Sequence, residues 1–257
     1  MQAPERRPRE MRVRDDPYRR IAKWYDRLVS PITRDLMLDG LRMFRPKPGN
    51  AILDVGCGTG LQLDLWHRYR CRLYGIDSSA AMLDVARRRL GDAAHLRLGD
   101  ASELPYDDNM FDLVTCTFVL HGMEHQVRLV ALKEMKRVMK DGGRILLTDL
   151  RQPCVLSTSA LVTKLIIFLF ELVEGRGTFA NYRYCMSTDC RAELISKNSL
   201  EIEKLITRKR CNTEIILLRK RALEAFGMTE QARRDERQLK KIMRCDAVEL
   251  CRRERRS

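Results

Sequence analysis

Residues 52–60 read Ile-Leu-Asp-Val-Gly-Cys-Gly-Thr-Gly, a short apolar run followed by a glycine-rich turn. The run has the length and composition of a buried strand. Gly56, Gly58 and Gly60 lack Cβ atoms, so the turn can take positive φ angles and a ligand can lie directly against its backbone. A helix that begins after such a turn directs its first N–H groups at the same ligand. The stretch therefore predicts a strand–turn–helix unit of the kind used by dinucleotide and nucleoside binders.

The spacing of the glycines separates this turn from two related ones. The dinucleotide fingerprint reads GxGxxG, and its third glycine would fall at position 61, which is Leu61 here. The chain also contains no GxxxxGK[ST] sequence, which is the signature of a triphosphate-binding loop. Both observations argue against those two classes of ligand.

Acidic residues stand at the ends of the first three predicted strands, as Asp54, Asp77 and Asp100. Because the carboxyl ends of parallel strands meet at one edge of the sheet, we expect the three carboxylates to border one ligand crevice. Asp77 is placed to accept hydrogen bonds from ribose hydroxyls, and Asp100 with its backbone is placed to meet an adenine edge. The alternative is a helix-capping role, above all for Asp77, which precedes Ser78 and Ser79.

Apolar strands alternate with helical patterns along most of the chain. This rhythm predicts an α/β fold with a mostly parallel sheet that helices cover on both faces. We expect the pair Gly142-Gly143 to end the helix before it, since glycine favours helix ends. Strands are predicted at 51–55, 72–76, 95–98, 111–118, 144–149, 200–206 and 214–218, and helices at 17–44, 61–69, 80–90 and 126–139.

The positive charge lies mostly at the two ends of the chain. Of the formal net charge of +14, residues 1–45 contribute +5 and residues 219–257 contribute +6, whereas residues 46–218 contribute only +3. We therefore expect a disordered basic arm at 1–16, a globular domain at 17–218 and a basic helical tail at 219–257. The near-neutral centre argues against a binding core made for polyanions.

The 9 cysteines are scattered, and no two of them form a CxxC pair. An odd number of cysteines argues against a disulfide framework, and the Arg- and Pro-rich start of the chain lacks the apolar run of a secretory signal. These features favour a reducing, cytoplasmic location.

Five segments together resemble the class I S-adenosylmethionine-dependent methyltransferases, in particular the ubiquinone/menaquinone-biosynthesis-like group with a methyltransferase type 11 domain. The resemblance covers roughly Tyr18 to Leu150. It implies a Rossmann-like, doubly wound, seven-stranded sheet that binds S-adenosyl-L-methionine in its first half, 17–150, and an acceptor-side cap at about 151–198. The segments are LDVGCGTG at 53–60, GID at 75–77, GDA at 99–101, LPYDDNMFDLV at 104–114 and RVMKDGGRILLTD at 137–149.

The resemblance also implies roles for individual residues. The three glycines of the turn hold the methionine portion of the cofactor, and Asp54 orders their loop. Asp77 binds the ribose and Asp100 the adenine amino group. Tyr25 belongs to an N-terminal segment that closes over the cofactor, with a plain core aromatic as the alternative. The full implied cofactor set is Tyr25, Asp54, Gly56, Cys57, Gly58, Thr59, Gly60, Asp77, Ser78, Met82, Asp100, Ala101, Thr117 and Phe118.

Methyl transfer needs a general base only if the acceptor must lose a proton. His121, just after the fourth strand, is the candidate, since histidine titrates near neutrality; a loop or helix-capping histidine is the alternative. His125 lies four residues later, but no third ligand is visible, so we expect no metal site. Tyr182 and Arg183 are candidates for contacts with the acceptor, and the alternative for them is a solvated loop.

The apolar run from Leu161 to Val173 is shorter than the roughly 20 residues needed to cross a bilayer, and it contains Lys164 and Glu171. We expect a cap helix that walls an apolar acceptor pocket or contacts an anionic membrane surface; a plain core helix is the alternative. The first reading favours a small-molecule or lipid-like acceptor, such as a quinone precursor or a phospholipid. Two other functions stay open: an RNA-directed methyltransferase that uses the basic arms, and a catalytically silent binding module.

Overall fold

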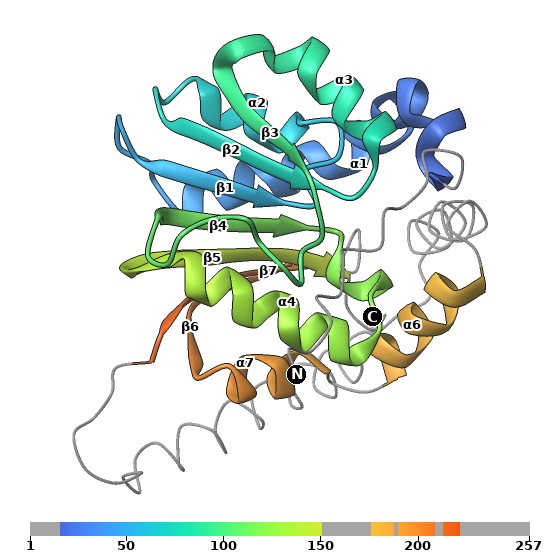
Figure 1. The fold of residues 1–257 in the computed structure, drawn as a ribbon. Helices are drawn as coiled ribbons and strands as arrows, with labels where there is room; N and C mark the ends of the chain where they lie inside the picture. Colours follow the sequence, from blue (N-terminus) through green and yellow to red (C-terminus); the bar gives the residue numbers. More distant parts are fainter. Residues whose placement is uncertain (1–15, 151–175, 188–189, 209–212, 222–257) are drawn as a thin grey trace, which may run out of the picture.

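The computed structural model describes residues 16–150, 176–187, 190–208 and 213–221 (Figure 1). The predicted basic arm, except for Asp16, lies outside these residues. So do the apolar run from Leu161 to Val173 and the basic tail beyond Arg221.

The described residues form one seven-stranded sheet with the order β3-β2-β1-β4-β5-β7-β6. The first five strands are parallel to one another, and β7 lies antiparallel between β5 and β6. The predicted mostly parallel, seven-stranded sheet is therefore confirmed. The strands are β1 (Ala51–Val55), β2 (Arg72–Asp77), β3 (Ala94–Leu98), β4 (Phe111–Thr117), β5 (Met139–Leu150), β6 (Leu200–Arg208) and β7 (Thr213–Lys220).

Helices cover both faces of the sheet (Figure 1). One face carries α1 (Ala22–Met43), α2 (Leu61–His67) and α3 (Ala80–Leu90), and the other carries α4 (His125–Val138) and α7 (Cys190–Lys197). The short 3-10 turns η2 (Pro17–Arg20) and η4 (Leu120–Gly122) lie beside the carboxyl ends of the strands, and α6 (Arg176–Ser187) packs on η4. This is the expected doubly wound arrangement.

The centre of the sheet is buried on both sides. All five residues of β1 are buried, and β4 and β7 are buried over most of their lengths. A central strand of a doubly wound sheet loses contact with water on both faces, which is why these segments are nearly continuous apolar runs. Polar residues interrupt the apolar runs at a few positions, and two of these, Asp54 of β1 and Thr115 of β4, are bonded to one another at the site described below.

The turn predicted at Asp141, Gly142 and Gly143 was wrong, although the helix before it ends within one residue of its predicted end. Helix α4 ends at Val138, and Asp141, Gly142 and Gly143 belong to β5 instead of a turn. The strand pairing shifts register between Phe111 and Leu113, opposite this segment. A Cβ on Gly143 would lie 2.7 Å from Met139 and 3.0 Å from two carbonyl oxygens, so the glycine permits a close backbone approach at an irregularity of the sheet.

Other features also differ from the sequence expectation. The helix predicted at 17–44 begins as the 3-10 turn η2, and the strand predicted to reach Phe118 ends at Thr117, because Phe118 has a φ of +58°. The segment around Tyr182, for which a solvated loop was the alternative, is helical in α6. Strand β7 runs to Lys220, two residues past the expected domain boundary. Within the described part of the chain, no helix combines the length and the apolar character needed to span a bilayer.

Candidate active site

A cavity of about 370 Å³ opens at the carboxyl ends of the parallel strands, between β1, β2, β4 and the N-terminal turn η2. This is the position at which open α/β sheets bind ligands, because adjacent loops diverge there. Its lining includes Asp16, Pro17, Tyr18, Tyr25, Gly56, Gly58, Asp77, Ser78, Ser79, Met82, Asp100, Ala101, Thr117, Phe118, Val119, His121, Gly122 and Met123.

The glycine-rich turn has two different reasons for its glycines. At Gly58, φ is +52° and a Cβ would meet no atom within 4 Å, so the backbone faces the open cavity. At Gly60, φ is +76° and a Cβ would lie 2.8 Å from Leu90 and 3.2 Å from Ala86 of α3. One glycine therefore lets a ligand approach, and the other lets a helix pack against the turn.

Asp77 closes the turn from the end of β2. Its Oδ2 accepts the backbone N–H of Gly58 at 2.7 Å, and its Oδ1 accepts that of Ser79 at 2.8 Å. Burial raises the pKa of Asp77, while the two N–H donors act in the opposite direction. The helix cap considered as the alternative for Asp77 is made by Ser79, whose hydroxyl accepts from the N–H of Met82.

Asp54 lies behind the cavity wall and is 2% exposed. It accepts the hydroxyl of Thr115 at 2.6 Å, which joins the ends of β1 and β4. Burial raises its pKa from an ordinary value of 3.8 to about 7, although the Thr115 hydroxyl opposes this shift. Its position agrees with a role in ordering the loop rather than with direct ligand contact.

Helix α1 is bonded to the turn through a group of three side chains that the sequence did not reveal. The hydroxyl of Thr59 donates to Asp26 of α1 at 2.6 Å. Arg89 of α3 pairs with the other oxygen of Asp26 and donates to the Thr59 carbonyl at 2.6 Å. The pair Arg89–Asp26 is less than a quarter exposed. We call Asp26, Thr59 and Arg89 the N-terminal clamp.

Asp16 is another cavity residue that the sequence did not reveal. Its carboxylate accepts the hydroxyl of Ser79 at 2.9 Å and the N–H of Ala81 at 3.0 Å, so it caps the start of α3. It also accepts the N–H of Tyr18 at 3.0 Å, which starts η2. Asp16 thereby holds the N-terminal turn against the far wall of the cavity.

Most residues implied for the cofactor meet at the cavity wall, and four lie behind it. The residues on the wall are Tyr25, Gly56, Gly58, Asp77, Ser78, Met82, Asp100, Ala101, Thr117 and Phe118. The residues behind it are Asp54, Cys57, Thr59 and Gly60, all of them buried. Burial raises the pKa of Tyr25 to about 12, with the carboxylates of Asp77 and Asp26 adding to the effect.

His121 in η4 lines the cavity and faces a carboxylate that was not predicted. Its Nδ1 lies 2.6 Å from Oδ1 of Asp149 at the end of β5, and its backbone N–H donates to Oδ2 at 3.0 Å. The two side chains are 16% and 12% exposed. Two contacts from one carboxylate fix both the position and the rotation of the imidazole.

His125 does not share the surroundings of His121. Its Nε2 lies 3.6 Å from Glu193 of α7. Among residues 16–150, 176–187, 190–208 and 213–221, no three His, Cys, Asp or Glu side chains are grouped to hold a metal ion.

Helix α6 places Tyr182 beside His121, outside the cavity lining. The ring centroids are 6.0 Å apart in an edge-to-face arrangement. Arg128, which is fully buried, donates to the carbonyls of His121 at 3.3 Å and Asn181 at 3.4 Å, and Asn181 donates to the Gly122 carbonyl at 3.0 Å. These bonds fix α6 against η4, while Arg183 lies on an exposed part of the helix.

Known proteins that are similar to this chain include methyltransferases, and the similarity extends over the glycine-rich turn. Residues 53–147 match a family described as a methyltransferase domain. A demethylmenaquinone methyltransferase of Shouchella clausii is 33% identical over 176 residues, which cover 64% of this chain and 72% of the relative. One of Bacillus mycoides is 33% identical over 159 residues, covering 58% of this chain and 66% of the relative. The chain thus spans just under two thirds of the second relative.

A solved structure supports the fold alone. A SAM-dependent methyltransferase of Aquifex aeolicus has a TM-score of 0.52 at 16% identity, covering 77% of this chain and 97% of that one. The shared sheet, the glycine-rich turn at its carboxyl edge and the identity to curated relatives lead to one conclusion: this chain belongs to the class I S-adenosylmethionine-dependent methyltransferases.

Proposed function

We propose that this protein transfers a methyl group from S-adenosylmethionine to a small-molecule or lipid-like acceptor, and that the acceptor carries a hydroxylated ring of the quinone-precursor type. The similarity to relatives named demethylmenaquinone methyltransferase supports an acceptor with such a ring. The observation that carries the proposal is the pair His121–Asp149, in which His121 lines the same cavity as the glycine-rich turn and Asp149 bonds to its imidazole.

The cavity fits the cofactor in shape and charge. The open backbone at Gly58 leaves space where a side chain would block the turn. Three carboxylates line the described cavity (Asp16, Asp77 and Asp100), and its described lining contains no Lys or Arg. An acidic wall suits a ligand that carries a sulfonium charge. Asp77 would hold the ribose, Asp100 and Ala101 the adenine, and the glycine turn with Thr117 and Phe118 the methionine end.

When bound, S-adenosylmethionine supplies an electrophilic methyl group next to a positive sulfur. The chain contributes mainly position: the turn, η4 and α6 hold the two reactants in line and keep water away. The N-terminal clamp and Asp16 hold the wall on the other side of the cavity.

His121 would accept the proton that the acceptor hydroxyl releases. With Nδ1–H donating to Asp149, the lone pair of the neutral imidazole lies on Nε2, and the proton from the hydroxyl ends there. The resulting imidazolium is stabilised by the Asp149 carboxylate. A hydroxylated ring that has lost this proton is the stronger nucleophile at its oxygen and at its ring carbons, so the pair suits either site of methylation.

Tyr182 and Arg183 are the proposed acceptor-side residues. Tyr182 packs edge-on to His121, where it would border the ring of the acceptor. Arg183 lies further out on α6 and would reach a polar or anionic substituent. A phospholipid head group is the second acceptor class; it needs no base if the nitrogen that accepts the methyl group is already neutral.

Methyl transfer to three defined acceptors tests the proposal: a naphthoquinol with a short prenyl chain, phosphatidylethanolamine in detergent, and total RNA. We expect transfer to the naphthoquinol. Transfer to the phospholipid or to RNA without transfer to the quinol would refute the ring-type acceptor. Failure to bind S-adenosylhomocysteine in calorimetry would refute the methyltransferase activity itself.

A further inference from the structure

The first turns of α1 have two chemically different faces. One face carries Tyr25 to the cavity and Asp26 to the N-terminal clamp. The other face is exposed and carries Lys23, Trp24 and Arg27, which continue at spacings of three, four and seven residues from Arg20 of the preceding η2. Together with exposed Arg19 of η2, these residues form what we call the cationic face: Arg19, Arg20, Lys23, Trp24 and Arg27.

The cationic face carries four positive charges and an aromatic ring. Trp24 is 57% exposed, and the guanidinium of Arg27 lies 4.8 Å from the centre of its ring. The two nearby acids have their bonds elsewhere: Asp16 accepts the hydroxyl of Ser79, and Asp26 bonds to Thr59 and Arg89. Among the described residues, no carboxylate forms an ion pair with a cation of this face.

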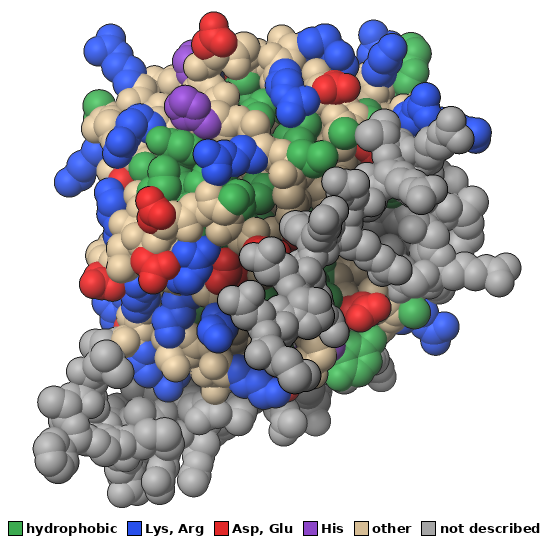
Figure 2. All heavy atoms as spheres, viewed as in Figure 1, with side chains coloured by type: hydrophobic (Ala, Val, Ile, Leu, Met, Phe, Trp, Pro, Cys, Tyr) green, Lys and Arg blue, Asp and Glu red, His purple; other side chains and the backbone are tan. Residues whose placement is uncertain are grey.

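Figure 2 shows basic and acidic side chains interspersed over the face that it presents. Such mixing is what keeps a soluble domain from binding polyanions generally. Four cations around the exposed Trp24 are a local feature of η2 and α1, and a smaller group, the exposed Tyr69 between Arg68 and Arg70, serves below as its control.

The cationic face adjoins the cavity. Pro17, Tyr18 and Tyr25 line the cavity from η2 and α1, and the residues between them in sequence carry the cations. Whatever the face binds is thus held within about two helical turns of the cavity mouth.

We propose that the cationic face docks on the surface of an anionic lipid bilayer. Tryptophan prefers the boundary between head groups and acyl chains, since its ring is apolar and its N–H is polar. Lys and Arg beside it are attracted to anionic head groups, and a helix with this arrangement lies flat on a membrane. One aromatic among four cations suits this surface better than single-stranded RNA, which needs several stacking rings. The inference deepens the proposed function and rests on it for its purpose, since a lipid-like acceptor would enter the cavity from the membrane.

Binding of the full chain to vesicles tests the proposal without any methyl transfer. The vesicles contain phosphatidylcholine alone or equal parts of phosphatidylcholine and phosphatidylglycerol. The chain has only 2 tryptophans, and Trp66 is fully buried, so a change of tryptophan fluorescence on binding reports Trp24. We expect a blue shift with anionic vesicles, and quenching when the lipids carry bromine on their acyl chains.

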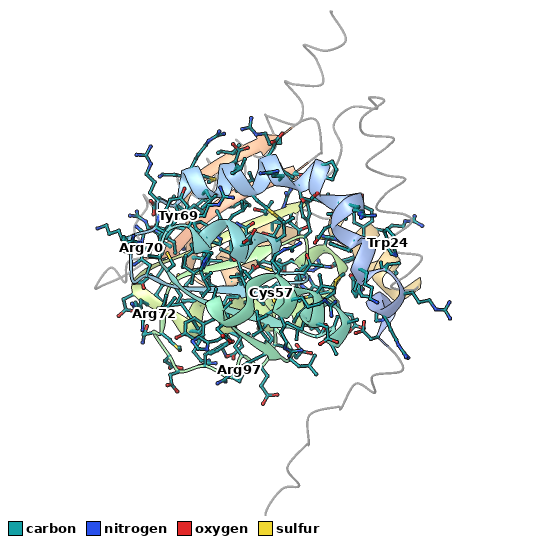
Figure 3. All side chains as sticks on the ribbon, turned by 90° about the horizontal axis from the view of Figure 1, so that it is seen from above. Trp24, Cys57, Tyr69, Arg70, Arg72 and Arg97 are labelled. Atoms are coloured by element: carbon teal, nitrogen blue, oxygen red, sulfur yellow. The ribbon has the colours of Figure 1, made fainter. Side chains whose placement is uncertain are left out.

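A matched pair of variants locates the binding surface. The variant Lys23→Gln/Trp24→Ala/Arg27→Gln removes two cations and one exposed aromatic from the cationic face. The control Arg68→Gln/Tyr69→Ala/Arg70→Gln also removes two cations and one exposed aromatic, and Figure 3 shows Tyr69 and Arg70 on the opposite side of the molecule from Trp24. The first variant should weaken partitioning by about thirtyfold or more, because each cation near an anionic surface is worth about fivefold. The control should leave it within about twofold of the original chain.

Three outcomes would overturn the proposal. They are equal losses for the two variants, equal binding to neutral and anionic vesicles, and binding to RNA in place of vesicles with the same dependence on the cationic face. Both variants are first compared for thermal unfolding and S-adenosylhomocysteine binding, so a loss of vesicle binding by a folded variant is assigned to the surface. If vesicles bind as expected but no methyl transfer to a quinol occurs, the proposed acceptor is wrong and the docking surface stands.

Discussion

The hydroxyl of Thr59 donates to the carboxylate of Asp26 over 2.6 Å, although the two residues come from the glycine-rich turn and from the helix that precedes the sheet. The turn is therefore braced from outside by α1 and, through Arg89, by α3. Since the same turn borders the cavity, the stability of the brace and the shape of the ligand site depend on one another.

The N-terminal clamp should show energetic coupling. In a double-mutant cycle of Asp26→Asn and Arg89→Met, we expect a coupling of about 1 kcal/mol or more in the free energy of unfolding, because the pair is partly buried and shares Thr59. The pair Asp84–Arg87 on α3 is the control; its side chains are 60% and 51% exposed, and its coupling should stay below about 0.5 kcal/mol. Equal coupling in the two cycles, measured by urea unfolding, would contradict the brace.

Replacing Asp77 should weaken cofactor binding while leaving the fold intact. Asp77→Asn removes the charge that fixes Gly58 and that would accept the ribose hydroxyls, so S-adenosylhomocysteine should bind about 10- to 100-fold less tightly. Calorimetry gives the affinity, and Asp84→Asn, an exposed acid on the next helix, serves as control. The assignment fails if both variants bind alike.

The pair His121–Asp149 should control catalysis and not cofactor affinity. His121→Gln should lower kcat with the naphthoquinol by about 100-fold or more and remove the acidic limb of the pH–rate profile. Asp149→Asn should lower kcat with little change in KM, because the imidazole loses the group that orients it. Unchanged S-adenosylhomocysteine binding shows that the site is intact. A purely structural pair would leave the shape of the pH profile as it is.

Asp54 should make the protein less stable as pH rises. Its folded pKa of about 7 exceeds its ordinary 3.8, so between these values the folded chain keeps a proton that the unfolded chain releases. The free energy of unfolding therefore falls across this window, by up to about 4 kcal/mol, and stays level above it. Asp54→Asn should remove this loss, because asparagine does not titrate. The free energy of unfolding of the variant, minus that of the original chain, should therefore be larger at about pH 8 than at about pH 5. Urea unfolding at the two pH values measures this difference. If it is identical at both pH values, Asp54 does not cause the pH dependence of stability.

The sequence predicted the first half of the fold better than the second. The bounds of β1 and α3 agree with those expected, because apolar runs and flanking turn residues are local signals. The position of β7 between β5 and β6 depends on pairing between distant segments, which no local pattern encodes. Gly142 and Gly143 were misread since glycine serves a helix end and a sheet irregularity equally well.

The sequence predicted where the cavity lies but did not predict the side chains that hold its walls in place. Strand-end acids and the glycine spacing located the cavity, but Asp16, Asp26 and Arg89 act through bonds that cross tens of residues. Asp149 carried a readable signal: it ends the fifth strand, as Asp77 ends the second. Strand-end acids, taken together, would have placed it beside His121.

The antiparallel strand β7 has a consequence for how the chain is made. Ile215 to Leu218 are fully or almost fully buried and pair with Ile145 to Thr148, which the ribosome delivers long before them. Until the last strand emerges, the nascent protein exposes an unpaired apolar edge at β5, where a neighbouring chain can add a strand. Completion of this sheet thus waits until Thr213–Lys220 have left the ribosome, and chaperones that shield strand edges should matter more for its yield in cells than for its stability once folded.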